Sequence, residues 1–439
     1  MIRTRRRIPA PGTRKTVMLL ELYGQNFGCF RDEFRLSMLA TDVDPGADRG
    51  IVKIKLEDDG EPLRLLRAVA IYGPNGSGKS TVIRAARGLR HLISETRRRH
   101  FRSDSLLRPY EPFALAAHGL NPVRLGIKAF IEGRVYDYEL QFGRAKLLSE
   151  RLHWLKANGD TVLFRREGQE VSGEWTKDER FTLLAKDFRP NALLLSLADR
   201  LTPALAKNIA VGIRRLLTSF DTPVQDLAPP WFSTDSSVAR RARDDSEFSA
   251  WLLSQLKSAD VGVVELRTRG ENVHVASLFG ETEVEKFVRL FLLHQGESGL
   301  FPIPYAYESH GTRKLIELAP MLFELAHGAR PHAVFIDEID ESLHPVLLQG
   351  IIRHFNCDIP MDKVRGQLIF VTHDTSLIDA EAKNALLRRD QIYLTEKDAS
   401  GAARLYSVAE FRERNNLNLR RRYLQGRYGA LPSLGTFGE

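Results

Sequence analysis

The stretch IYGPNGSGKST, residues 71–81, contains the pattern G-x-x-x-x-G-K-[ST] from Gly73 to Ser80. A β-rich run at 65–73 precedes the glycine loop, and apolar residues at 82, 83, 86, 89 and 93 follow it with helical spacing. Strand, glycine loop and helix in this order form the structural context that a phosphate-binding loop requires. The stretch therefore predicts an α/β fold that binds a nucleoside triphosphate.

The glycines, Lys79 and Ser80 of the loop suit contact with phosphate and its metal ion. Glycines permit backbone conformations in which successive N–H groups point at phosphate oxygens, and the N-terminus of the following helix adds its dipole. Lys79 is predicted to reach the β and γ phosphates of ATP, and Ser80 to ligate Mg²⁺. The predicted nucleotide-binding residues of the loop are Gly73, Pro74, Asn75, Gly76, Ser77, Gly78, Lys79, Ser80 and Thr81.

A second motif, VFIDEIDESLHP at 334–345, supplies acidic residues. Four apolar residues, 333–336, predict a buried strand that ends at Asp337, and phosphates bind at the carboxyl ends of such strands. Asp337 is the predicted second metal ligand. Glu338 can polarise the attacking water as a general base. Asp340, Glu341 and His344 are more typical of loop structure than of catalysis.

Two further motifs complete the predicted site. In FVTHD, 370–374, His373 ends another apolar strand and is predicted to contact the γ-phosphate, so Lys79, Glu338 and His373 form the predicted catalytic set. In ESHGTRKLIELAP, 308–320, a helix is predicted to begin at Ser309, Gly311 and Thr312. Exposed N–H groups and a small hydroxyl at a helix start favour anion binding. These three residues are added to the predicted nucleotide contacts.

The composition limits the class of protein. The 439 residues carry a formal net charge of +8, concentrated in arginine-rich runs at 3–7, 97–99, 240–243 and 420–422. Such runs either follow a nucleic-acid backbone or form solvated faces. No apolar run approaches the roughly 18 residues of a membrane span, and the two cysteines suggest neither a disulfide framework nor a zinc site. We expect a soluble, cytoplasmic protein without membrane contacts.

Changes in pattern along the chain predict four parts. Residues 1–16 form a basic, disordered arm. Residues 17–177 hold the first part of the ATPase domain, with an antiparallel β meander from about 123 to 167. Residues 178–298 form a mostly helical inserted lobe, and residues 299–439 return to the ATPase domain.

The order of the four motifs resembles the ABC-type P-loop ATPases, including the SMC-like and OLD-like branches. This resemblance implies a homodimer or higher oligomer, in which the Ser-x-Gly helix of one subunit completes the ATP site of another. The sequence SHGT at 309–312 departs from the LSGGQ of transporters. The glutamine usual in that family has no predicted position in this sequence, and Gln141 is not assigned to the site. The C-terminal nuclease of OLD proteins has no counterpart here, so no nuclease activity is assigned.

A closer resemblance covers nearly the whole chain. The resemblance rests on the segments YGQNFGCFRDEFRLSML at 23–39, ESHGT at 308–312, DEIDESLHP at 337–345, LLRRDQIYLTEKD at 386–398 and YLQGRYGALP at 423–432. They are similar to the bacterial RloA/AbiL-type ATPases, catalogued as AAA-family proteins. That resemblance implies an ATPase sensor or switch in antiphage abortive-infection defence, paired with a separately encoded effector, often of RloB type. The alternative is a DNA-binding, SMC-like repair or recombination ATPase.

Overall fold

The protein is described from a computed structural model that covers residues 17–42, 48–57, 61–96, 102–115, 122–186, 188–198, 204–220, 234–276, 282–327, 332–358, 366–378, 385–411 and 418–432. The predicted arm at 1–16 and the arginine-rich runs at 3–7 and 97–99 lie outside these residues.

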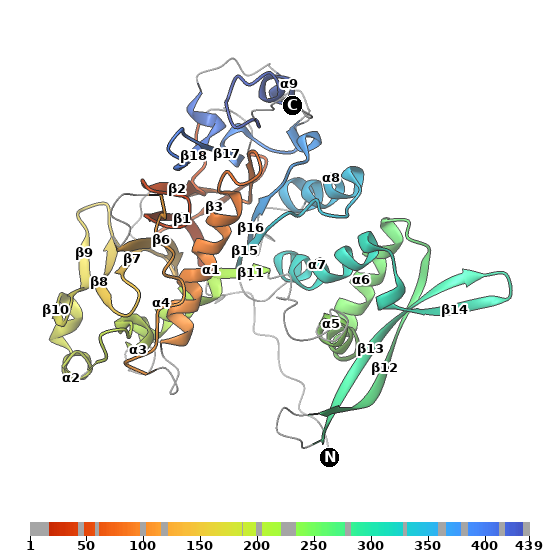
Figure 1. Cartoon of the computed structure of the whole chain (residues 1–439), viewed down its shortest axis with the longest axis horizontal. Helices are drawn as coiled ribbons and strands as arrows, with labels where there is room; N and C mark the ends of the chain where they lie inside the picture. Colours follow the sequence, from red (N-terminus) through yellow and green to blue (C-terminus); the bar gives the residue numbers. More distant parts are fainter. Residues whose placement is uncertain are drawn as a thin grey trace.

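The centre of the molecule is a six-stranded sheet with the order β11-β15-β16-β5-β17-β18 (Figure 1). Its strands are β5 (Ala68–Tyr72), β11 (Leu217–Phe220), β15 (His332–Ile336), β16 (Gly366–Val371), β17 (Ile392–Lys397) and β18 (Ala403–Ser407). The first five strands in this order are parallel, and β18 pairs with β17 in the antiparallel sense. Strands buried on both faces read as continuous apolar runs, which is why AVAIY and HAVFI were recognisable from sequence.

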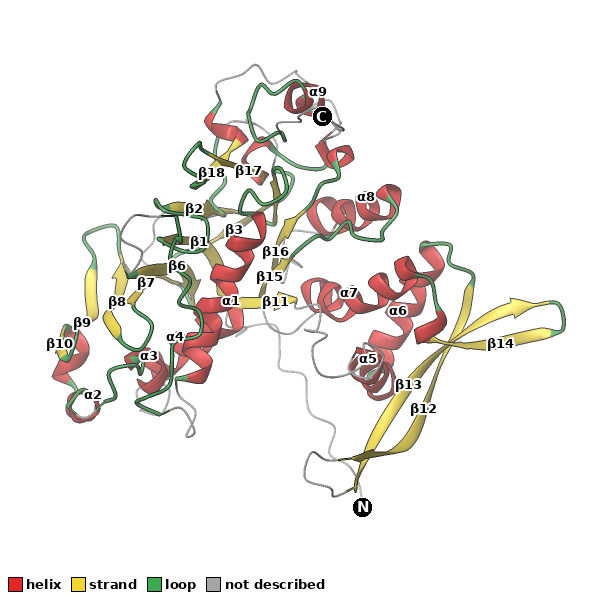
Figure 2. Ribbon diagram, in the orientation of Figure 1, coloured by secondary structure: helices red, strands yellow, loops and turns green. Residues whose placement is uncertain are grey.

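Alternate residues of β5 face two different apolar clusters. Val69 and Ile71 pack with α1 (Lys79–Glu95), α4 (Ala204–Leu216) and a second sheet. Ala68, Ala70 and Tyr72 pack in the other cluster. Helices of this second cluster are α5 (Thr234–Asp244), α6 (Ser246–Ser258), α7 (His310–His327) and α8 (Pro345–Arg353). The predicted α/β class is confirmed, with helices covering both faces of a largely parallel sheet (Figure 2).

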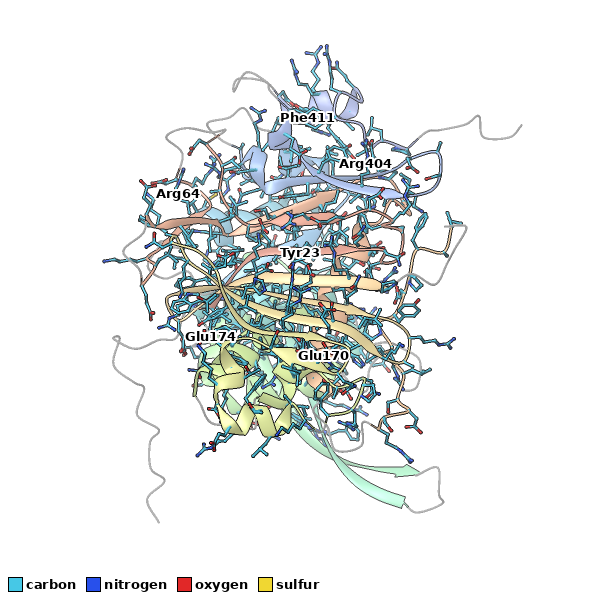
Figure 3. The ribbon with its side chains drawn as sticks, turned by 90° about the vertical axis from the view of Figure 1, so that its left-hand side faces the viewer. Tyr23, Arg64, Glu170, Glu174, Arg404 and Phe411 are labelled. Carbon is cyan, nitrogen blue, oxygen red and sulfur yellow. The ribbon has the colours of Figure 1, made fainter. Side chains whose placement is uncertain are left out.

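The second sheet has seven antiparallel strands in the order β10-β9-β8-β7-β6-β1-β2. They are β1 (Val17–Gln25), β2 (Phe34–Ser37), β6 (Val123–Ile131), β7 (Arg134–Phe142), β8 (Leu147–Leu155), β9 (Thr161–Glu167) and β10 (Glu170–Ser172). The predicted meander is therefore present. Figure 3 shows Tyr23, on β1, between the meander and the part of the chain that carries Arg404. Strands β3 (Ile51–Ile54) and β4 (Leu63–Leu66) form a separate two-stranded sheet.

The region predicted as a mostly helical lobe, 178–298, contains strands as well as helices. Helices α2 (Glu179–Leu184), α3 (Leu194–Ala198), α4, α5 and α6 (Ser246–Ser258) are present, but β11 joins the central sheet. Strands β12 (Val263–Ala276), β13 (Thr282–Gly296) and β14 (Gly299–Pro304) form a three-stranded antiparallel sheet that projects from the body (Figure 1). These strands were not predicted because the run VRLFLL at 288–293 has apolar residues at adjacent positions, a pattern that fits a helix as well as a strand. The domain boundaries themselves stay a prediction.

The remaining elements are short. Helix α9 (Leu419–Leu424) lies near the C-terminus. The other turns of helix are Glu174–Lys177, Tyr305–Tyr307, Thr375–Ile378, Arg389–Gln391 and Val408–Glu410, and a π-helical turn spans His354–Asp358.

Candidate nucleotide-binding site

Three predicted segments meet at one edge of the central sheet. Strands β15, β16 and β5 are neighbours and run parallel, so their carboxyl ends share an edge. Gly73 follows β5, Asp337 follows β15, and His373 comes two residues after β16. The loops are also joined directly, because the Ile339 N–H donates to the Val371 carbonyl over 3.1 Å. The glycine loop, the acidic pair and the histidine are thereby brought together.

The phosphate loop has the backbone that its glycines allow. Gly73, Gly76 and Gly78 have φ values of 150°, 72° and 112°, which L-residues rarely adopt. Nothing lies within 4 Å of the place that a Cβ on Gly76 would take, so the middle of the loop is open. Helix α1 begins at Lys79, and no side chain caps its N-terminus. Uncapped N–H groups and the helix dipole favour an anion at this place.

Lys79 lies over the loop and faces the acidic residues. Its ammonium donates to the carbonyls of Gly73 and Pro74 over 2.9 and 3.0 Å. Burial lowers the pKa of Lys79 below its usual value, and the nearby carboxylates of Asp337 and Glu338 oppose that shift. The ammonium therefore lies between the glycine loop and the acidic strand end, where a phosphate oxygen can replace the two carbonyls.

Asp337 has the chemistry of a magnesium ligand. Its side chain is half-buried, and one of its oxygens, Oδ1, is buried without a hydrogen-bond partner among the described residues. An unpaired buried carboxylate oxygen is costly unless it is satisfied by a ligand. Within the described chain no three His, Cys, Asp or Glu side chains gather as a metal site. Mg²⁺ is bound by one or two protein oxygens together with waters and substrate phosphates, so the Ser80 hydroxyl and Asp337 suit it.

Glu338 and His373 are both exposed at this edge. Glu338 has φ of 49°, a left-handed conformation that costs a non-glycine residue about 1 kcal/mol or more. Such strain is often retained at functional sites. The His373 backbone N–H donates to Oδ2 of Asp340 over 3.2 Å, so Asp340 ties the two loops together. The sequence pattern predicted only a loop role for Asp340, because a contact with the backbone of a distant segment leaves no local pattern.

The predicted Ser-x-Gly helix start lies beside the acidic loop. The Ser309 hydroxyl accepts from the Thr312 N–H over 3.1 Å and lies 2.9 Å from the Thr312 hydroxyl. A Cβ on Gly311 would come within 2.8 Å of the Ser342 carbonyl oxygen. Among the described residues, no hydrogen bond joins Ser309 or Thr312 to residues 73–81. The structure does not bring this helix start to the phosphate loop of its own chain.

Cys29 and Thr395 pack against the phosphate loop, although no sequence motif marks either residue as part of the site. Cys29 Sγ lies 3.4 Å from the Thr81 hydroxyl, and a Cβ on Gly78 would come within 2.7 Å of that sulfur. Thr395 Oγ1 lies 2.5 Å from the Ser77 hydroxyl oxygen. The Ser77 side chain therefore points to β17, although the backbone of Ser77 remains part of the loop.

A glycine loop after a central parallel strand, with an acidic strand end two strands away, defines a P-loop nucleotide-binding domain. Residues 68–379, which include all four motifs, match the family described as “AAA domain, putative AbiEii toxin, Type IV TA system”. The chain belongs to this family of AAA domains, and membership implies nucleotide binding. The expectation of an AAA-family ATPase is confirmed.

Solved structures with distant similarity include the SMC head domain from Thermotoga maritima. It is 14% identical, with 89% of this chain and 98% of that chain covered and a TM-score of 0.39. The recombination mediator RecF in its ATP complex is 11% identical, with 89% and 100% covered and a TM-score of 0.33. No curated protein matches the sequence. In the described part of the chain, every helix is too short or too polar to span a membrane.

Proposed function

We propose that the protein is a cytoplasmic, Mg²⁺-dependent ATPase that hydrolyses ATP between two copies of itself and switches a separately encoded effector in antiphage, abortive-infection defence. The observation that carries the ATPase proposal is the meeting of Lys79, Asp337 and His373 at the ends of three adjacent parallel strands. The family description names a toxin of a toxin–antitoxin system, which supports a defence role.

The proposal gives a task to each side chain of the site. Lys79 exchanges its two carbonyl partners for oxygens of the β and γ phosphates. Ser80 and Asp337 would hold Mg²⁺, which would neutralise phosphate charge when bound. Glu338 accepts a proton from the attacking water, and His373 orients the γ-phosphate. Little covalent chemistry is asked of the protein, because phosphoryl transfer depends mainly on positioning and electrostatics.

A second copy completes the proposed site. Ser309 and His310 are exposed at the start of α7, and their helix packs on the loop after Asp337 instead of on the phosphate loop. An exposed helix start with a small hydroxyl can receive the phosphates held by another subunit. The effector is proposed from the resemblance to RloA/AbiL-type proteins, in which an RloB-like partner is encoded separately.

The test is Glu338→Gln, which removes the base but keeps the shape of the side chain. Loss of general-base catalysis is expected to slow hydrolysis about 100-fold or more, while ATP binding persists. Light scattering in ATP should then show a trapped dimer. Glu341→Gln is the matched control, since Glu341 lies in the same loop and pairs with Lys314 over 3.2 Å. Wild-type hydrolysis by Glu338→Gln would refute the assignment of the base.

A DNA-binding, SMC-like ATPase is the second candidate. The net charge of +8 is concentrated in arginine-rich runs, and those at 240–243 and 420–422 lie within the described residues. Such runs can follow a nucleic-acid backbone. This candidate predicts hydrolysis stimulated by DNA and binding that weakens steeply with added salt. Absence of both effects in the purified protein would exclude it.

A further inference from the structure

The segment LLRRDQIYLTEKD, residues 386–398, lies beside the phosphate loop although none of its residues belongs to a nucleotide-binding pattern. Strand β17 pairs with β5 in parallel, with Ile392 opposite Ala70 and Leu394 opposite Tyr72. The next residue, Thr395, therefore lies beside Gly73, where the loop begins.

Thr395 connects the loop to the sheet through a chain of hydroxyl groups. The Thr395 hydroxyl donates to the Tyr72 carbonyl over 3.3 Å. Because a hydroxyl has one proton, the short 2.5 Å contact between Thr395 and Ser77 must use the Ser77 proton. The chain of donors thus runs from Ser77 to Thr395 to Tyr72. Thr395 is fully buried and Ser77 is 2% exposed, so water does not compete for these bonds.

Packing reinforces the same contact. A Cβ on Gly73 would come within 2.4 Å of the Thr395 carbonyl oxygen and 2.5 Å of its hydroxyl oxygen. The start of the loop is therefore in van der Waals contact with β17, whereas the space around Gly76 is open. The loop is fixed at its base and accessible in its middle.

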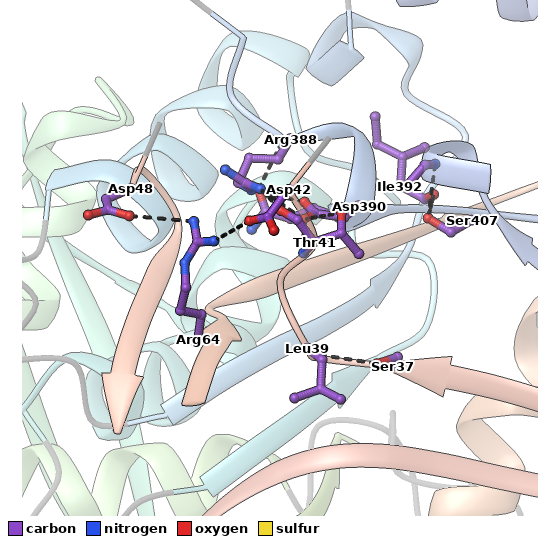
Figure 4. Close-up of polar contacts among 12 residues, drawn as sticks. Ser37, Leu39, Thr41, Asp42, Asp48, Arg64, Arg388, Asp390, Ile392 and Ser407 are labelled. Carbon is purple, nitrogen blue, oxygen red and sulfur yellow. Dashed lines mark hydrogen bonds and ion pairs between the residues drawn. The ribbon is translucent and has the colours of Figure 1, made fainter. Parts of the chain in front are cut away.

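The segment that carries Thr395 is itself firmly anchored (Figure 4). Arg388 and Asp390 form a buried ion pair at 2.9 Å. Asp390 Oδ2 also accepts from the Thr41 N–H over 2.8 Å, and Arg388 donates to the Thr41 carbonyl over 2.9 Å. A buried polar network in which all partners are satisfied is rigid. Thr395 therefore has a fixed support on which to hold the loop.

We propose that Thr395 is a positioning residue for the phosphate loop. Its hydroxyl holds Ser77, and so sets the backbone between Ser77 and Lys79 in a phosphate-binding conformation before the nucleotide arrives. A loop that is ordered in advance loses less conformational entropy on binding. The inference rests on the proposed function, because it concerns the affinity of the same site for ATP.

The test compares Thr395→Val, which removes the hydroxyl and keeps the shape, with Thr395→Ser, which keeps the hydroxyl. The matched control is Thr96→Val, because Thr96 is fully buried and donates to the Leu92 carbonyl over 2.8 Å at the other end of α1. ATP affinity is measured by calorimetric titration, and folding by the thermal midpoint without nucleotide.

Thr395→Val is expected to weaken ATP binding about 3- to 10-fold, the worth of one hydrogen bond. Thr395→Ser and Thr96→Val should stay within about 2-fold of wild type. Ser77→Ala removes the other end of the bond, so the double variant with Thr395→Val should lose no more affinity than either single change.

Wild-type affinity in Thr395→Val, additive losses in the double variant, or an equal loss in Thr96→Val would overturn the inference and leave the proposed function intact. Failure of the wild-type protein to bind ATP would instead refute the proposed function, and the inference with it. If Thr395→Val does not fold, Ser77→Ala alone must still weaken binding, and wild-type affinity in that variant overturns the inference.

Discussion

Removal of the Asp340 carboxylate should slow ATP hydrolysis without weakening ATP binding. In the structure, Oδ2 of Asp340 accepts from the His373 backbone N–H over 3.2 Å. A hydrogen bond to a charged group contributes about 1.5–3 kcal/mol, and the lower value applies here because His373 is exposed and its freed N–H can be hydrated. A loss of about 1.4 kcal/mol corresponds to a factor of ten. Asp340→Ala is therefore expected to lower kcat about 10-fold, since the His373 loop is then held in place less often.

The same change is not expected to weaken ATP binding. The Asp340 carboxylate is one of the negative charges near Lys79, so its removal does not oppose the binding of phosphate. KM for ATP should stay unchanged or fall. Steady-state kinetics with Asp340→Ala and Asp340→Asn separate the two effects, because Asn keeps an oxygen that can accept from His373. The Asn variant should keep kcat within about 3-fold of wild type, a loss of less than 1 kcal/mol.

Asp245→Ala is the control, since Asp245 accepts a similar backbone bond, from Phe248 over 3.0 Å, at the start of α6. The reasoning is wrong if Asp340→Ala keeps the wild-type kcat. It is also wrong if Asp340→Asn is as slow as Asp340→Ala, because the charge would then matter and the connection to His373 would not.

Three further changes test other parts of the structure. Gly311→Ala places a Cβ 2.8 Å from the Ser342 carbonyl oxygen, so the substitution should shift the start of α7. ATP-dependent dimerisation, measured by light scattering, should then weaken, and an unchanged dimer would contradict the proposed role of this helix start. Glu150→Ala leaves the buried Arg166 without its counter-charge and should lower the free energy of unfolding by about 3–5 kcal/mol in urea titrations. A loss under about 1 kcal/mol would show that Glu150 is not needed as the counter-charge of Arg166. Chelation of Mg²⁺ should stop hydrolysis reversibly, and full activity in EDTA would exclude a metal at Asp337.

The parts of the fold that could be predicted share one property, a strong local pattern. Residues 333–336 are continuously apolar and end at an acidic pair, and the glycine loop follows a similar run, so strand direction alone brings both to one sheet edge. The meander was recognisable because apolar and polar residues alternate along its sequence, as from Tyr136 to Phe142 in β7. Local periodicity was sufficient in both regions.

What could not be predicted depends on contacts between distant segments. Ser77 and Thr395 are 318 residues apart, and no periodicity in either segment indicates the other. Strand β11 is likewise recognisable only by its pairing with β15, because LTSF at 217–220 directly continues the residues of helix α4. Tertiary pairing, more than intrinsic propensity, decides whether such a short segment becomes a strand.

The loop after Asp337 is the point at which these separate observations meet. On one side Asp340 holds the backbone of His373, and on the other the carbonyl of Ser342 is in contact with Gly311 at the start of α7. Closely packed elements transmit small displacements because they cannot be compressed. A change in the position of Glu338 on hydrolysis would therefore move the helix start proposed to face the second subunit, which is the mechanical requirement for an ATP-controlled switch.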